Sequence, residues 1–289
     1  MPRLPPSNSM KITKRDAIRI AIAYGEVFDY PLSEDEVRIW APYVMLSKHL
    51  IGIRSAKRLL SIRRKRSAWS EEKWIRARRV ANLLKLIPTI ALIGVTGGLT
   101  RSNAKEEDDI DFLIITTPKT LWVSRALSTI LLDLFGLRRR PRDTKLRNLI
   151  CLNMFMSEEG LRVPPNERDL FTAHEVLLMT PLWERDGIYK SFLYANAWVK
   201  KFLPNAWGEK VKSKKWKVKN GKSYKAFSIL EPIARFIQLR YMRKRQTSEV
   251  VSDTVIRFHP RDARVWIKHK LGVRLKRYNI PLDKIFYGR

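Results

Sequence analysis

Two aspartates that lie two positions apart are the residues of this chain best suited to chemistry. Asp109 and Asp111 lead directly into the apolar segment 112–115, which is typical of a buried β-strand. Successive side chains of a strand point to opposite faces, so both carboxylates share one face while Ile110 points into the core. Like charges this close raise the pKa of one carboxyl unless a cation lies between them. We therefore predict that the pair binds a hard divalent ion, Mg2+ or alternatively Mn2+.

A pair of glycines precedes the two aspartates. Residues 90–96 are apolar and β-branched, which predicts a short buried strand that ends at Gly97 and Gly98. Glycine has no β-carbon, so its backbone N–H groups can come close to an anion and form a concave binding site. Glycine pairs and Asp-x-Asp sequences are each common in turns and at strand starts. Their order here, a strand, a glycine turn and an acidic strand, is more specific and predicts a site for a triphosphate bridged by Mg2+.

Residues 97–112 resemble the signature of the DNA polymerase beta-like nucleotidyltransferase superfamily, in particular its minimal, small-substrate branch. That signature, Gly-Ser-x-Ala-Arg-Gly-x-Ala-x-x-x-Ser-Asp-Ile-Asp-Leu, aligns with this segment without a gap. The matching residues are Gly97, Arg101, Ala104, Asp109, Ile110 and Asp111. The departures are Gly98 for Ser, Thr100 for Ala, Ser102 for Gly and Asp108 for Ser. With segments 28–32 and 257–262, the wider chain also resembles a group of uncharacterised bacterial proteins with a nucleotidyltransferase domain.

The resemblance implies an α+β fold in which a nucleotidyltransferase-type mixed sheet is flanked by helices. It also implies a reaction in which a nucleoside monophosphate moves from an NTP to an acceptor hydroxyl and pyrophosphate is released. Asp109 and Asp111 would hold the metal ions. The residues implied to bind the nucleotide are Gly97, Gly98, Arg101 and Ser102.

A third carboxylate on a later strand is usual in this superfamily, but the matching residue of this chain is an asparagine. The candidate strand is segment 148–156, whose central polar residue is Asn153. An amide oxygen can bind a metal, but it cannot take a proton at neutral pH. We predict a catalytic set of Asp109, Asp111 and Asn153. The spacing leaves Asp143, Glu158 and Glu175 open as substitutes, and it leaves open a protein that binds nucleotide or nucleic acid with impaired catalysis.

Composition gives the chain a strongly positive balance, with a net charge of +30 over 289 residues. Residues 200–249 contain 15 Lys and Arg against 3 Glu, interleaved with aromatic residues. Further basic clusters occupy segments 54–79 and 138–142. Such clusters fit RNA or another polyanion as the acceptor, although a charge run is more often a solvated surface. The single cysteine, Cys151, lies in an apolar run and is expected to pack as a small hydrophobic residue.

Along the chain we predict three parts. Residues 1–69 form a small helical, winged-helix-like unit, residues 70–165 the nucleotidyltransferase core, and residues 166–289 a helical C-terminal domain. Helices are expected over segments 71–86, 120–135, 169–179, 229–245 and 261–276. The first residues lack an apolar leader, and the longest apolar stretch, 121–137, is short and carries two charges. We therefore expect a cytoplasmic protein without a transmembrane segment.

Overall fold

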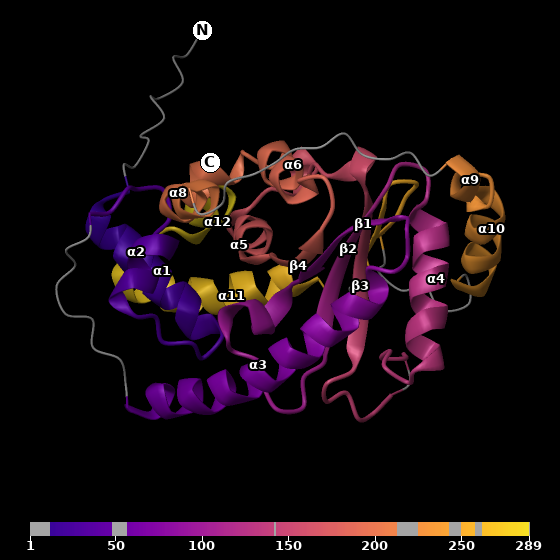
Figure 1. Ribbon diagram of the computed structural model, residues 1–289. Coiled ribbons are helices and arrows are strands. Elements are labelled where there is room, and N and C mark those ends of the chain that lie inside the picture. The colour runs from indigo at the N-terminus through magenta and orange to yellow at the C-terminus, as the bar shows by residue number, and fades with distance from the viewer. Residues whose placement is uncertain are drawn as a thin grey trace, which may run out of the picture.

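The computed structural model describes residues 12–47, 57–141, 143–212, 225–242, 250–257 and 262–288. It is an α+β structure in which helices cover a mixed β-sheet (Figure 1). The strands are β1 (Ile90–Val95), β2 (Ile110–Thr116), β3 (Ile150–Ser157), β4 (Thr180–Glu184), β5 (Val250–Val251) and β6 (Val255–Arg257). The helices are α1 (Lys14–Val27), α2 (Glu34–Trp40), α3 (Lys57–Leu84), α4 (Leu121–Leu134), α5 (Leu170–Leu178), α6 (Ile188–Ala195), α7 (Val199–Phe202), α8 (Pro204–Lys212), α9 (Lys225–Ser228), α10 (Glu231–Met242), α11 (Ala263–Leu275) and α12 (Leu282–Tyr287).

The described strands form one six-stranded sheet with the order β4-β1-β2-β3-β6-β5. Strands β2 and β3 are parallel, and the other neighbouring pairs are antiparallel. The parallel pair needs a crossover, and helix α4 supplies it between the end of β2 and the start of β3. The two strands that carry the predicted site residues therefore lie side by side in the middle of the sheet.

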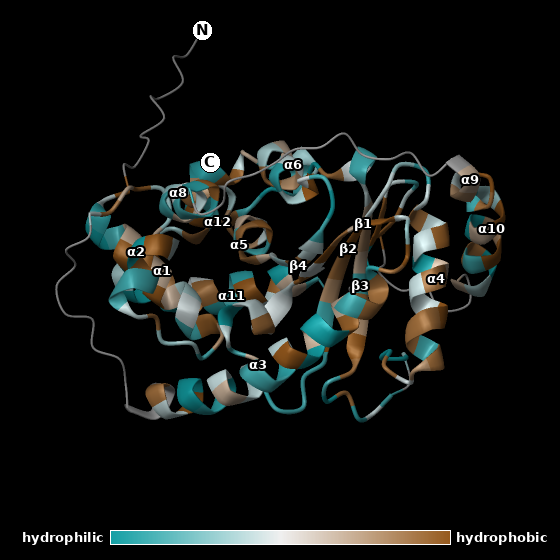
Figure 2. Ribbon diagram, viewed as in Figure 1, coloured by the Kyte–Doolittle hydropathy of each residue, from teal (hydrophilic) through white to brown (hydrophobic). Residues whose placement is uncertain are grey.

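Two hydrophobic cores lie on opposite faces of the sheet. One joins alternate residues of β1 to β3 with helices α3, α4 and α10. The other joins the remaining strand residues with α1, α5 to α8, α11 and α12. Strand β2 shows the alternation directly, since Ile110, Phe112 and Ile114 belong to the first core, and Leu113 and Ile115 to the second. Figure 2 shows the resulting brown, apolar strands between helices that carry polar outer faces.

Several local predictions are confirmed. Segment 90–95 is a strand with every residue buried, and helices cover most of segments 71–86, 120–135 and 169–179. Ser33 and Glu36 form a reciprocal capping box at the start of α2, as a Ser-x-x-Glu sequence predicts. Asp169, which the predicted helix 169–179 included, instead caps α5 by accepting a hydrogen bond from the Thr172 backbone N–H. Local sequence signals were sufficient for these elements because the partners lie within one turn of the helix.

The C-terminal segment is not purely helical, which corrects the predicted helical domain over residues 166–289. Strands β4, β5 and β6 come from this segment and extend the same sheet as β1 to β3. They have only two to five residues each, and Pro181 within β4 was interpreted only as a helix stop. Edge strands tolerate proline because one side of the strand makes no ladder hydrogen bonds. Strands this short show no periodic pattern that a sequence could reveal.

The predicted boundary between residues 69 and 70 falls inside helix α3, which runs from Lys57 to Leu84. Of the basic segment 200–249, residues 213–224 and 243–249 lie outside the described part of the chain. Within the described part of the chain, no helix combines the length and apolar character needed to cross a bilayer.

Candidate functional site

The predicted aspartates meet at the start of β2, on the sheet face that α1 and α5 cover. Asp109 immediately precedes the strand, and Asp111 is the one residue of β2 that is not fully buried. An oxygen of each carboxylate and the sulfur of Cys151 all lie within 4.8 Å of one another. This is the spacing of atoms that could share one metal ion. The prediction that the two aspartates share one face and one small space is confirmed.

The glycine turn packs directly against the second aspartate. Gly97 has a positive φ of 72°, and a β-carbon at this position would lie 2.8 Å from Asp111 Oδ2. Both its backbone conformation and its contact therefore require glycine. Gly98 differs, because the nearest atom to a β-carbon there would be 3.7 Å away. A serine would fit at position 98, so the usual residue of the signature is compatible with this turn.

Cys151, not Asn153, is the residue of β3 that pairs with Asp111. The parallel register places Ile110 beside Ile150 and Asp111 beside Cys151. The register then shifts between Phe112 and Leu113, and Asn153 lies at this irregularity in a buried position. Asn153 is thus two residues further along the strand than the residue that joins the carboxylates. Burial and the two carboxylates raise the pKa of the Cys151 thiol, so it is protonated at neutral pH.

An arginine from the loop after α4 makes direct contact with the first aspartate. Arg139 Nη1 lies 2.7 Å from Asp109 Oδ2 and 4.0 Å from Cys151 Sγ. The loop is held in place by a hydrogen bond from the Arg139 backbone N–H to the Ile150 carbonyl oxygen at the start of β3. The side chain of Arg139 is 38% exposed, whereas that of Asp109 is 14% exposed. One guanidinium thus approaches the carboxylates from the solvent side.

The pKa of Asp111 is shifted because this carboxylate is buried and confined close to a second one. Burial and the Asp109 carboxylate raise the pKa of Asp111 to about 7, although Cys151 and Arg139 oppose the shift. Glu175 on α5 contributes to the same increase, which places its charge close to the pair. Burial also raises the pKa of Glu175 itself. Of the three open substitutes for the third acid, Glu175 is the one whose charge acts on Asp111.

Arg101 lies at the end of the glycine turn and contacts Glu175 and the rings of α1. Its Nη2 atom is 3.6 Å from Glu175 Oε1, and its guanidinium lies 4.6 Å from the centre of the Phe28 ring. The side chain is 11% exposed. Arg101 therefore links the turn to α5 and to the end of α1. The predicted contact of Arg101 with phosphate remains a prediction.

A cavity of about 190 Å3 opens beside this arginine, between the N-terminal helices and the glycine turn. Ser102 and Arg101 line one side, and the rings of Tyr24, His174 and Trp40 line another. Tyr24 and His174 are stacked with ring centres 3.9 Å apart. The Tyr24 hydroxyl is buried and has no hydrogen-bond partner among the described residues. Such a cavity offers flat aromatic surfaces and one unused polar group to a small ring.

His174 belongs to this aromatic wall, as the prediction of a buried histidine requires. It is 3% exposed, and its Nδ1 atom is 2.8 Å from the Leu170 carbonyl oxygen. Burial and the nearby Arg101 charge lower the pKa of His174 to about 3. The imidazole is therefore neutral at physiological pH and contributes a ring rather than a charge.

A buried lysine holds the loop that leads to the aspartates. Lys73 on α3 is 1% exposed, and its ammonium group donates to the carbonyl oxygens of Glu106 and Asp108 at 3.0 and 2.6 Å. It also donates to Asn148 Oδ1 at 3.0 Å, in the loop before β3. One side chain thus fixes the entry of both strands that carry the site.

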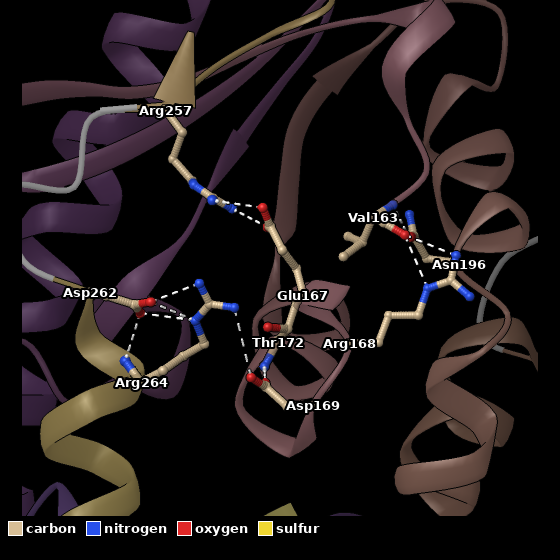
Figure 3. Close-up of polar contacts among 9 residues, drawn as sticks. All are labelled: Val163, Glu167, Arg168, Asp169, Thr172, Asn196, Arg257, Asp262 and Arg264. Carbon is tan, nitrogen blue, oxygen red and sulfur yellow. Dashed lines mark hydrogen bonds and ion pairs between the residues drawn. The ribbon is translucent and has the colours of Figure 1, made fainter. Parts of the chain in front are cut away.

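Helix α5, which carries His174 and Glu175, is positioned by ion pairs with the C-terminal elements (Figure 3). Arg257 of β6 pairs with Glu167 at 2.7 and 3.2 Å, just before the helix begins. Arg264 at the start of α11 pairs with Asp262 and lies 3.9 Å from the capping residue Asp169. Residues almost 100 positions apart in the sequence therefore fix the helix that faces the aspartates.

Comparison of the chain with known proteins found no match to any family model, to any curated protein or to any solved structure.

Three participants of the site were not predicted from the sequence. Cys151 was expected only to pack, Arg139 was counted in a basic cluster, and Lys73 was one of many basic residues of its helix. The strand register and the crossover loop bring the first two to Asp109 and Asp111. The sequence could have suggested Cys151, because it lies two residues before Asn153 and so faces the same side of a regular strand. The pairing register of β2 with β3, which distinguishes the two residues, depends on the tertiary structure.

We expect Gly97→Ala to destabilise the protein. Alanine in the left-handed region costs about 1–2 kcal/mol, and its β-carbon would displace the Asp111 side chain. Thermal unfolding should show a lower Tm for Gly97→Ala than for the matched control Gly98→Ala. Equal Tm values for the two variants would contradict this account of the turn.

We expect the stability of the metal-free protein to depend on the charge of Asp111. Its folded pKa is raised above the ordinary value of 3.8, so the folded state holds the proton more tightly. The tighter binding of this proton stabilises the folded state. The stabilisation is complete below pH 3.8 and is lost as the pH rises through about 7. In EDTA, Asp111→Asn should therefore raise Tm relative to wild type at pH 8 and have little effect near pH 4. Glu107→Gln, which changes an exposed acid of the same loop, should show no such pH dependence.

Replacing Lys73 with methionine should destabilise the loops that precede β2 and β3. The change removes the ammonium donor from three partly buried acceptors, at a cost of about 1–3 kcal/mol in the free energy of unfolding. Urea unfolding measures this cost directly. Lys65→Met, at an exposed position of the same helix, is the matched control, and an equally small effect for both would refute the anchoring role of Lys73.

Proposed function

We propose that this protein is a metal-dependent nucleotidyltransferase that moves a nucleoside monophosphate from an NTP to an acceptor hydroxyl and releases pyrophosphate. The observation that carries the proposal is the contact between the glycine turn and the acidic pair, in which Gly97 abuts Asp111. The mixed sheet with helices on both faces supports the proposal, since the resemblance to the superfamily implies a mixed sheet flanked by helices.

The residues at the start of β2 fit a divalent cation. Asp109 and Asp111 supply oxygen ligands, and their mutual repulsion would be relieved by a positive ion. Cys151 places a thiol within the same 4.8 Å cluster, and this thiol would have to lose its proton to bind the ion. Sulfur is a softer ligand than oxygen, which favours Mn2+ over Mg2+ relative to an all-carboxylate site. The metal would stabilise the charge that develops on the phosphoryl oxygens.

The remaining residues have distinct roles in this proposal. The backbone N–H groups of Gly97 and Gly98 hold the phosphates. Arg139, whose side chain reaches the site from solvent, moves from Asp109 to a phosphate oxygen when the nucleotide binds. Glu175 takes the proton of the acceptor hydroxyl, because burial gives it the raised pKa that suits a general base.

The cavity beside Arg101 is proposed to receive the ring of the nucleotide or of its acceptor. The Tyr24 and Trp40 rings that line this cavity would pack against a planar ring. Its volume of about 190 Å3 suits a single ring system rather than an extended ligand. RNA or another polyanion remains the proposed acceptor for a chain of this charge, and the use of NTP fits a cytoplasmic location.

A second function is favoured by one observation, the ion pair between Arg139 and Asp109. A guanidinium can neutralise a carboxylate pair permanently, and the third acidic position of β3 holds Cys151. In this alternative the protein keeps the fold and binds a nucleotide or nucleic acid without turnover. It predicts NTP binding that does not need a divalent ion.

Pyrophosphate release distinguishes the two functions. Purified protein is incubated with Mg2+ or Mn2+ and each labelled NTP, with cellular RNA, protein or small-molecule extracts as acceptors. We expect Asp109→Asn and Asp111→Asn to lower the rate at least about 100-fold, since they remove the charge that holds the metal. Glu175→Gln should lower kcat more than it changes KM.

Asp108→Asn is the matched control, because Asp108 lies beside the pair and accepts a hydrogen bond from the Lys105 backbone N–H that asparagine can keep. Its rate should stay near that of wild type. Absence of turnover with every NTP and acceptor, together with NTP binding that persists in EDTA, would favour the second function. Turnover that survives Asp109→Asn would refute the proposed role of the pair.

A further inference from the structure

Helix α10 exposes a continuous apolar surface, which we call the α10 face. It consists of Ile229, Leu230, Ile233, Phe236, Ile237 and Tyr241, whose exposed fractions range from 51% to 75%. From Ile229 onward the spacing of three or four residues places these side chains on one side of the helix. Figure 1 shows α9 and α10 at one end of the molecule, outside α4.

The opposite side of α10 attaches it to the protein through polar contacts. The Glu231 carboxylate accepts hydrogen bonds from the Trp122 and Val123 backbone N–H groups at 2.8 and 2.9 Å, at the N-terminus of α4. Gln238 Nε2 donates to the Trp122 carbonyl oxygen at 2.8 Å. Leu239 and Met242 pack into the core beneath the helix. The helix is thus firmly docked while its largest apolar side chains point outward, the reverse of an ordinary surface helix.

The described charges beside this face are mixed. The adjacent cavity is lined by Lys119, Arg235 and Arg240 together with the acids Glu159 and Asp253. Glu231 is the single acid of α10 and is used to cap α4, whereas Arg235 and Arg240 lie on the exposed side. Arg235 shares an ion pair with Asp253 at 2.9 Å. The whole chain carries a net charge of +30. An apolar helix face bordered by arginines matches an interface whose interior is apolar and whose surface is anionic.

We propose that the α10 face binds the surface of an anionic lipid bilayer, with its apolar side chains among the acyl chains and its arginines at the head groups. Phe236 and Tyr241 could stack on bases, but the other four side chains of the face are aliphatic and neither stack on bases nor pair with phosphates, so the face as a whole does not suit RNA. A second copy of the chain would bring two strongly positive molecules together. The proposal is independent of the nucleotidyltransferase function.

Vesicle cosedimentation tests this inference on the full chain. We expect binding to phosphatidylcholine vesicles that contain phosphatidylserine to be at least about 10-fold tighter than binding to phosphatidylcholine alone. The double variant Ile233→Glu/Phe236→Glu should lower the affinity for the anionic vesicles by at least about 10-fold. Both positions are exposed, so unchanged circular dichroism and Tm should accompany the loss.

The charge-matched control is Leu86→Glu/Val265→Glu, which alters two exposed apolar residues outside the α10 face. It should retain most of the vesicle binding. Equal loss in both double variants would mean that net charge alone drives adsorption, and would overturn the proposal. RNA binding without vesicle binding, or a dimer in analytical ultracentrifugation that Phe236→Glu dissociates, would also overturn it.

Discussion

The repulsion between two carboxylates at the start of a central strand is the constraint around which the candidate site is organised. Asp109 and Asp111 must share one face because they lie two residues apart on β2. Partial burial makes the shared position unfavourable for two negative charges, which is why the pKa of Asp111 is raised. The repulsion is reduced by the Arg139 guanidinium, which pairs with Asp109, and by the presence of the Cys151 thiol, rather than a third acid, beside Asp111. A bound cation would complete this balance.

Elements from both ends of the chain converge on that position. Helix α3 contributes Lys73 to the loop before β2, and α1 supplies Tyr24 and Phe28 to the cavity beside the glycine turn. Helix α5 brings Glu175, and its own position depends on ion pairs with β6 and α11 (Figure 3). Because these elements share hydrophobic cores with the sheet, the N-terminal and C-terminal segments are parts of the site's architecture rather than separate attachments.

Several arginines of the basic clusters form ion pairs and hydrogen bonds within the protein. Arg63 pairs with Glu36, and Arg66 donates to Asn103 and to the Phe28 carbonyl oxygen. Arg138 and Arg140 both pair with Asp133. Parts of two clusters that resemble nucleic-acid contacts in the sequence are therefore engaged in intramolecular ion pairs. Arg235 of α10 likewise pairs with Asp253, but it lies beside a surface of exposed apolar side chains.

The sequence alone determined those features whose causes are local. Strand alternation placed Asp109 and Asp111 on one face, the apolar run before Gly97 predicted β1, and a capping box located α2. Tertiary structure decided which residues surround the pair. The register between β2 and β3 selected Cys151 over Asn153, the crossover loop delivered Arg139, and helix packing brought Glu175 near. These contacts join segments that are 30 to 70 residues apart, and residue type and short-range spacing do not encode them. The alternation of a strand or the cap of a helix, by contrast, is complete within a few residues.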